Sequence, residues 1–144
     1  MDLAKPMAAG LVHVGYVVRN MDASIRRFAN DGYKLEVEPT DDPIQRVTCA
    51  QLTDGVTSVE LVSPLGEDSP VQTRLKRGGG LDHLCFAVPD VETAMQAEVE
   101  RGAIVACEPV RAVTFNRTIG FVFRKTGLII EYMSTEALPE ESSE

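Results

Sequence analysis

The sequence contains no tryptophan, only two histidines and three cysteines, and no long uninterrupted apolar run. A membrane-spanning helix needs about 20 consecutive apolar residues, so the sequence predicts neither such a helix nor a membrane partner. The three cysteines form no CxxC motif and no even set. This argues against a disulfide scaffold and favours the reducing cytoplasm as the protein's location.

Basic residues are also scarce. Fourteen Lys and Arg are outnumbered by 22 Asp and Glu, which gives a net charge of −8. Because nucleic-acid binding depends mainly on neutralising phosphates, this balance argues against a nucleic-acid partner. The chain is 44% apolar and 25% charged, as globular proteins commonly are, and its 144 residues suffice for one domain with its own core.

The sequence does contain an internal repeat with an offset of 70 residues. The segment that starts at His13 matches the segment that starts at His83 without a gap over about twenty residues, so that Gly32 matches Gly102. Self-similarity of this kind indicates two copies of one supersecondary unit.

Each copy predicts a βαβββ unit. An apolar run with β-branched residues predicts the first strand. An Asn or Asp then stands where a helix N-cap belongs, and apolar residues at helical spacing follow it. A glycine marks the end of each predicted helix. The predicted helices begin at Met21 and Val91. The predicted strands cover 11–18, 33–38, 46–53 and 57–63 in the first copy and 84–88, 103–107, 118–124 and 127–133 in the second.

This pattern predicts the α+β fold class, with two paired βαβββ modules in a single domain. The expected boundaries are an N-terminal extension at 1–10, module one at 11–64, a linker at 65–80, module two at 81–134 and an acidic tail at 135–144. Within the linker, residues 71–76 can form a short helix, and the tail lacks apolar periodicity.

One His on the first strand and one Glu on the last strand occur in both modules. The pairs are His13 with Glu60 and His83 with Glu131, separated by 47 and 48 residues. If the modules pair about a pseudo-twofold axis, two imidazoles and two carboxylates converge, a set that suits one divalent ion of Zn, Ni, Co, Mn or Mg. The alternative is that each Glu points to solvent from an alternating strand.

Over residues 11–134 the chain resembles the vicinal oxygen chelate superfamily, the glyoxalase and bleomycin-resistance-like proteins. Over 61–91 it resembles methylmalonyl-CoA epimerases, where Pro-Leu-Gly-Glu-Asp-Ser-Pro is followed by Gly-Leu-Asp-His. The resemblance implies a cup-shaped sheet around a metal and a homodimer. It also implies that the metal ligands are His13, Glu60, His83 and Glu131.

The resemblance further implies a second acid/base carboxylate in an acidic pair before the third strand, and this pair lands on Asp41 and Asp42. The chain departs from the family here, because it has Asp-Asp-Pro-Ile-Gln where the family has Glu-Glu-Gln-Gly-Val. The candidate catalytic residues are therefore Glu131 and Asp42, with Asp41 as a substitute for Asp42, and Tyr16 and Glu108 follow them. An acidic pair before a proline is also typical of a solvated turn.

The implied function is a metal-dependent epimerase or isomerase that shifts a proton next to the carbonyl of a small carbonyl acid or acyl thioester. A bound divalent ion stabilises the enolate formed in such a reaction. A glyoxalase-like lyase or isomerase would use the same four ligands. A third alternative is a non-catalytic small-molecule binding protein of the same fold. Such members of the superfamily generally lack the four ligands, so the presence of all four residues favours an enzyme over a binding protein.

Overall fold

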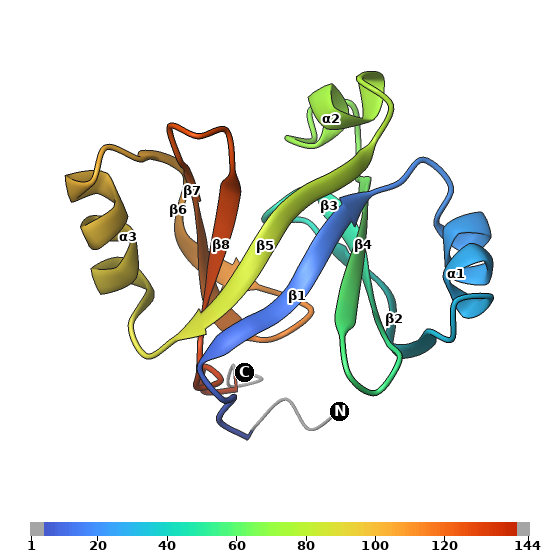
Figure 1. Ribbon diagram of the computed structural model, residues 1–144, viewed down its shortest axis with the longest axis horizontal. Helices are drawn as coiled ribbons and strands as arrows, with labels where there is room; N and C mark the ends of the chain where they lie inside the picture. The colour runs from blue at the N-terminus through green and yellow to red at the C-terminus, as the bar shows by residue number, and fades with distance from the viewer. Residues whose placement is uncertain (1–4, 141–144) are drawn as a thin grey trace.

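The computed structural model describes residues 5–140, which form two βαβββ modules joined into one curled sheet (Figure 1). Module one contains β1 (Gly10–Val17), α1 (Met21–Ala29), β2 (Lys34–Asp42), β3 (Val47–Thr53) and β4 (Ser58–Pro64). The short helix α2 (Gln72–Lys76) follows. Module two contains β5 (Gly80–Val88), α3 (Val91–Glu100), β6 (Ile104–Ala112), β7 (Arg117–Phe123) and β8 (Ile129–Ser134).

The eight strands form a single sheet in the order β2-β3-β4-β1-β5-β8-β7-β6. The modules join where β1 pairs antiparallel with β5, and each of these strands pairs parallel with the last strand of its own module. The sheet curls into a half-barrel with α1 and α3 on its outer side and α2 above one end (Figure 1). The predicted fold class and the pairing of two modules are thereby confirmed.

Local chemistry explains why both long helices form where the sequence predicts them. The side chain of Asn20 accepts a hydrogen bond from the Ala23 amide at 3.0 Å, and Asp90 accepts one from the Thr93 amide at 2.9 Å. Such N-caps satisfy amides that lack a partner inside the helix. The apolar face of each helix then packs against the outer face of the sheet. Met21, Ile25 and Phe28 of α1 lie over β3 and β4, and Val91 and Met95 of α3 lie over β7 and β8.

The two edge strands are longer than predicted. Strand β2 continues to Asp42 rather than ending near residue 38, and β6 continues to Ala112 rather than ending near 107. Both contain a proline at the same place in the repeat, Pro39 and Pro109. An edge strand tolerates proline because the side of the strand that faces solvent makes no hydrogen bonds to another strand. In both strands the pairing register shifts beside the proline.

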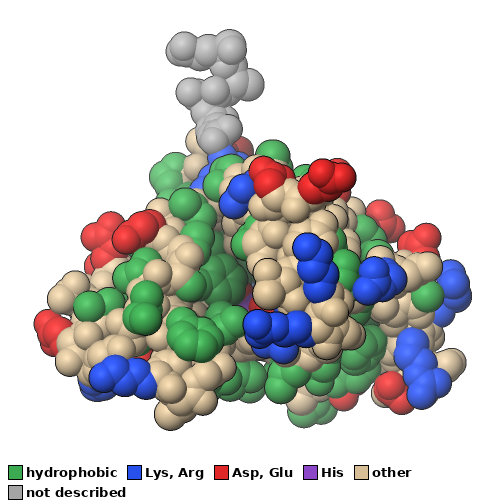
Figure 2. Space-filling view, turned by 90° about the horizontal axis from the view of Figure 1, so that it is seen from above, with side chains coloured by type: hydrophobic (Ala, Val, Ile, Leu, Met, Phe, Trp, Pro, Cys, Tyr) green, Lys and Arg blue, Asp and Glu red, His purple; other side chains and the backbone are tan. Residues whose placement is uncertain are grey.

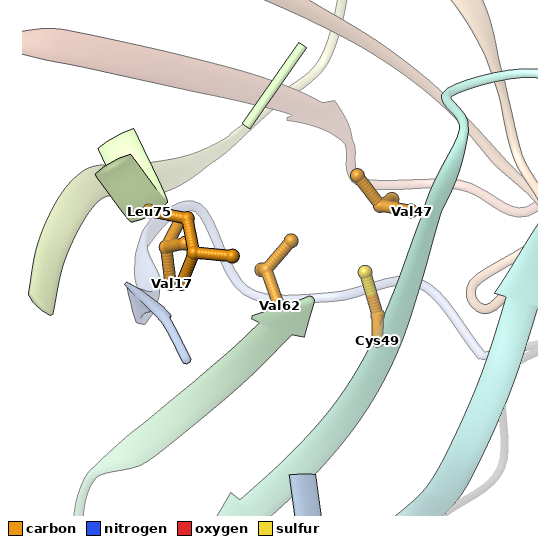
Figure 3. Packing of buried hydrophobic residues seen from close by; sticks show 5 residues of the cluster. All are labelled: Val17, Val47, Cys49, Val62 and Leu75. Carbon is orange, nitrogen blue, oxygen red and sulfur yellow. The ribbon is translucent and has the colours of Figure 1, made fainter. Parts of the chain in front are cut away.

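At one end of the half-barrel, α2 is fixed by a small apolar cluster. Leu75 of α2 packs with Val17 and Val62, and Val47 and Cys49 of β3 complete the cluster (Figure 3). This contact places α2, from the predicted linker, beside the inside of the cup.

The ends of the described chain are hydrogen-bonded to the body. The Met7 amide donates to the Thr135 carbonyl at 2.7 Å, and Leu138 and Asn116 bond to each other. Residues 1–4 of the predicted extension and 141–144 of the predicted acidic tail lie outside the described residues. Among the described residues, no helix has the length and apolar character needed to cross a membrane.

Candidate metal centre

The four repeated His and Glu residues meet inside the cup, each on one of the four central strands. His13 lies on β1, Glu60 on β4, His83 on β5 and Glu131 on β8. One ligating atom from each lies within 4.8 Å of those of the other three. All four residues are at most 6% exposed, so the alternative in which the two Glu point to solvent is excluded.

The spacing of the ligating atoms fits one divalent ion. His13 Nε2 lies 3.2 Å from His83 Nε2, and both nitrogens lie close to Glu131 Oε1, at 3.1 and 3.2 Å. Glu60 Oε1 lies 3.6 Å from His13 Nε2 and 3.4 Å from His83 Nε2. Ligands about 2.1 Å from a metal, at tetrahedral or octahedral angles, lie roughly 3.0–3.4 Å from each other. These five separations are close to that geometry, and two nitrogens with two carboxylate oxygens form the N₂O₂ donor set of a borderline or hard ion.

Identical strand register in the two modules brings the quartet together. The parallel pairing of β1 with β4 places Glu60 opposite Gly15, and that of β5 with β8 places Glu131 opposite Cys85. Gly15 and Cys85 are themselves equivalent in the repeat. Each Glu therefore lies beside its module's His on the concave face.

Gly15 is a site residue that sequence reasoning missed. It pairs with His83 across β1 and β5, and a Cβ atom at residue 15 would lie 2.1 Å from Cε1 of the His83 ring. Only a residue without a side chain leaves room for this imidazole. The available signal was a glycine inside an apolar strand, which often marks a close approach of another group.

Two further side chains are hydrogen-bonded to the quartet. Asp82 Oδ2 lies 2.8 Å from Nδ1 of His83, and the Gln51 side-chain amide donates to Glu60 Oε2 at 2.6 Å. Within the described part of the chain, Nδ1 of His13 makes no hydrogen bond. Sequence reasoning missed Gln51 because its contact depends on the pairing of β3 with β4, which places it opposite Glu60.

The electrostatics of the cluster favour a bound cation. Burial alone would lower the pKa of His83, but its hydrogen bonds with Asp82, Glu131 and Glu60 raise that pKa well above the ordinary value. Burial alone would raise the pKa of Glu131, but hydrogen bonds from both imidazoles lower it. Buried carboxylates that attract protons to their neighbours also attract a metal ion, which supplies the same positive charge.

The cysteines supply no thiolate ligand to this cluster. All three are free, and burial raises the pKa of each thiol. Cys85 is fully buried and packs in an apolar cluster, as expected of a small core residue.

Three of the four residues border a cavity of about 300 Å³. Figure 2 shows the hollow from the side on which α2 lies, with hydrophobic side chains around it and histidine at its floor. Glu60, His83 and Glu131 line it together with polar side chains that include Gln45, Arg46 and Asp82. Its apolar lining includes Ile44, Val47, Val62, Val71, Ala106, Ala112, Phe115, Phe121 and Ile129. A mainly apolar cavity with a few convergent polar groups is typical of a small-molecule site.

Asp41 and Asp42 lie at the end of β2 and do not line this cavity. Asp42 is 1% exposed, so it is not a solvated turn residue. Its carboxylate accepts hydrogen bonds from the amides of Ile44, Gln45 and Val113 and from the Gln45 side chain, at 2.8–3.1 Å. Asp41 accepts one from the Thr48 hydroxyl at 2.7 Å. Pro43 begins a turn over residues 43–46, and Ile44 and Gln45 within that turn line the cavity instead.

The two remaining acid/base candidates also lie away from the quartet. Tyr16 packs with Phe28 of α1, with ring centroids 5.7 Å apart, on the outer side of the sheet. Glu108 is exposed on the edge strand β6.

Comparisons with known proteins agree with this geometry. Residues 13–121 match the Glyoxalase/Bleomycin resistance protein/Dioxygenase superfamily. An ethylmalonyl-CoA/methylmalonyl-CoA epimerase of Cereibacter sphaeroides is 34% identical over 101 residues, which are 69% of this chain and 75% of that protein. The mitochondrial methylmalonyl-CoA epimerase of Bos taurus is 29% identical over 115 residues, covering 78% and 65%. The crystal structure of a methylmalonyl-CoA epimerase from Mycobacterium tuberculosis has a TM-score of 0.76 at 27% identity, over 90% of this chain and 89% of that one.

Proposed function

The chain belongs to the glyoxalase/bleomycin resistance protein/dioxygenase superfamily, and we propose that it is a metal-dependent epimerase that moves a proton α to the carbonyl of a small acyl thioester. The observation that carries this proposal is the buried His–Glu quartet, three members of which line an apolar cavity. The curated relatives are epimerases of methylmalonyl-CoA, so this thioester is the first substrate to test.

His13, Glu60, His83 and Glu131 would hold the ion. A divalent ion bound there would polarise the substrate carbonyl and stabilise the negative charge that develops as the α-proton leaves. The donor set is compatible with Co, Mn, Zn, Ni or Mg. Gln51 would keep Glu60 in place through the hydrogen bond to its second oxygen.

Glu131 is the residue proposed to take the α-proton. Its carboxylate lies between the two imidazoles and lines the cavity, so it can reach both the ion and a bound substrate. Its lowered pKa keeps it ionised at neutral pH, as a proton acceptor must be. The apolar walls exclude water and strengthen these charge interactions.

Asp42 is assigned a positioning role. It fixes the turn that presents Ile44 and Gln45 to the cavity through the hydrogen bonds described above. A role for Asp42 as the second acid/base group, which the family resemblance implies, requires its carboxylate to leave that turn. A positioning role and an acid/base role for Asp42 predict different effects of its replacement on proton exchange at the two faces of the substrate.

We also propose that the protein acts as a homodimer in the cytoplasm. The outer faces of β1 and β5, between α1 and α3 (Figure 1), carry the repeat-equivalent leucines Leu11 and Leu81, which are 58% and 56% exposed. Directly paired residues share a sheet face, and the partners of these leucines are Phe86 and Tyr16. Light scattering should give the mass of a dimer, and Leu11→Glu with Leu81→Glu should give a monomer.

Incubation of the metal-loaded protein with methylmalonyl-CoA in heavy water tests the proposed reaction. We expect deuterium to enter at C2 of the acyl group, together with interconversion of the two C2 epimers from either starting epimer. The His83→Ala protein is the matched control and should exchange little. Wild-type protein that retains one equivalent of metal but exchanges no C2 proton of this or related 2-acyl thioesters would overturn the substrate assignment.

A further inference from the structure

Asp82, the residue before His83, lies at an irregularity in the pairing of β1 with β5. Gly15 pairs with His83 and Tyr16 pairs with Leu81, so Asp82 is one extra residue on β5. Neighbouring residues of a regular strand point to opposite faces, and an inserted residue re-aims side chains. The insertion therefore explains how Asp82 can reach the imidazole that immediately follows it.

The Asp82 carboxylate is held from two sides. Oδ2 lies 2.8 Å from Nδ1 of His83, and Oδ1 lies 3.7 Å from Nε of Arg74 on α2. The side chain is only 12% exposed and lines the same cavity as Glu60, His83 and Glu131. A carboxylate with one oxygen on the imidazole and the other facing a cation has little freedom to turn away.

The first module provides an internal comparison. The register of β1 with β5 also shifts between Leu11 and His13, which leaves Val12 as the extra residue there. Val12 is the repeat equivalent of Asp82, and it packs in an apolar cluster. The ring of His13 is instead stacked on Phe115, with centroids 6.0 Å apart. Both modules thus have the same insertion before the His, but only the second carries a carboxylate in it.

We propose that Asp82 is a positioning residue that fixes the ring orientation and tautomer of His83. By accepting a hydrogen bond from Nδ1–H, it leaves Nε2 unprotonated and directed at Glu60, Glu131 and the His13 nitrogen. Partners of this kind tune the affinity of a metal-binding histidine. The inference rests on the proposed metal site and is independent of the substrate.

The affinity for Zn²⁺, measured by competition with a chromophoric chelator, tests this role. We expect Asp82→Ala to weaken Zn²⁺ binding about 10–100-fold, and Asp82→Asn, whose amide oxygen can accept the same hydrogen bond, to recover most of the loss. Asp68→Asn is the matched control, because Asp68 pairs with a cavity-lining arginine, Arg46, but is 74% exposed and contacts no ligand. Circular dichroism of each variant confirms folding.

A second measurement needs no variant. Nitrogen-15 NMR of the Zn²⁺-loaded wild-type protein should show His83 protonated at Nδ1. Protonation at Nε2 instead, or a folded Asp82→Ala protein with wild-type Zn²⁺ affinity, would overturn the inference. Weakened Zn²⁺ binding by Asp82→Ala in a protein that exchanges no thioester proton would support the inference and refute the proposed substrate.

Discussion

The imidazole of His83 occupies the space that a side chain at Gly15 would need. The two residues are direct partners across the β1–β5 junction, and a Cβ at residue 15 would overlap the ring. The pairing that joins the two modules therefore also fixes a candidate ligand. Gly15 does not have a positive φ, so this position requires the missing side chain of glycine rather than an unusual backbone conformation.

The first prediction concerns this contact. Gly15→Ala should displace His83 and weaken metal binding about 10-fold or more, as loss of a ligand-orienting contact does, while the sheet remains folded. Val14→Ala, one residue earlier on the same strand, is the control and should keep wild-type metal affinity. Titration with Zn²⁺ and circular dichroism measure the two properties. Equal metal affinity in Gly15→Ala and wild type would contradict this prediction, because it would show that the His83 ring can move aside without loss of metal binding.

The second prediction concerns Asp42. Asp42→Ala leaves three part-buried amides, including that of Val113 on the opposite module, without the acceptor that Asp42 provides. An unsatisfied buried donor costs about 1–3 kcal/mol, so urea unfolding should show a loss of that order. Asp41→Ala removes one exposed hydrogen bond to Thr48 and should cost less than about 1 kcal/mol.

Proton exchange from the two C2 epimers of the substrate separates the possible roles of Asp42. If Asp42 is a positioning residue, Asp42→Asn should slow exchange from both epimers alike. A loss of about 10²–10⁴-fold confined to one epimer would instead identify Asp42 as a general acid/base.

The third prediction concerns removal of the metal. The hydrophobic clusters on both sides of the sheet do not include the quartet, so the fold should survive a chelator, unlike that of a zinc finger. Metal at 100 times its dissociation constant should then add about 2.7 kcal/mol to the free energy of unfolding. Complete loss of secondary structure on adding the chelator would contradict this expectation.

The fourth prediction concerns pH. His83 has a raised pKa in the folded chain, so its stabilising contribution is complete below its ordinary pKa of 6.5 and is lost as pH rises through the raised value. Glu131 has a lowered pKa, so its contribution is complete above its ordinary pKa of 4.5 and is lost as pH falls through the lowered value. The metal-free protein should receive both contributions between about pH 4.5 and 6.5.

Thermal unfolding of metal-free protein should therefore show a falling Tm as pH rises above that window. Zn²⁺ affinity should change in the opposite direction and increase with pH, because the ion competes with protons for the same ligands. The His83→Gln protein is the control and should lose most of the Tm slope. A Tm that rises with pH in metal-free wild type but not in His83→Gln would contradict the charge assignment.

The repeat allowed both the fold and the quartet to be predicted from sequence. Equivalent spacings placed His13, Glu60, His83 and Glu131 at equivalent strand positions, and a pseudo-twofold pairing sufficed to bring them together. The starts of the two long helices were predictable because Asn20 and Asp90 cap them through hydrogen bonds to amides only three residues away. These features depend on nearby residues or on symmetry, and neither requires the detailed register of the sheet.

The residues that support the quartet could not be predicted in this way. Gly15 and Gln51 act through cross-strand pairing, and Asp82 is itself the inserted residue that interrupts the usual alternation of its strand. Asp42 was identified from a family resemblance in a loop where the sequence differs from that family. There, the hydrogen bonds of the turn determine where the carboxylate lies.

The metal content of purified protein, measured by mass spectrometry after loading and removal of excess ion, tests the central claim most directly. Wild type should retain one equivalent of divalent metal per chain, and His13→Ala and His83→Ala should each retain far less while remaining folded. Unchanged metal content in both variants would contradict the assignment of this quartet as the metal centre.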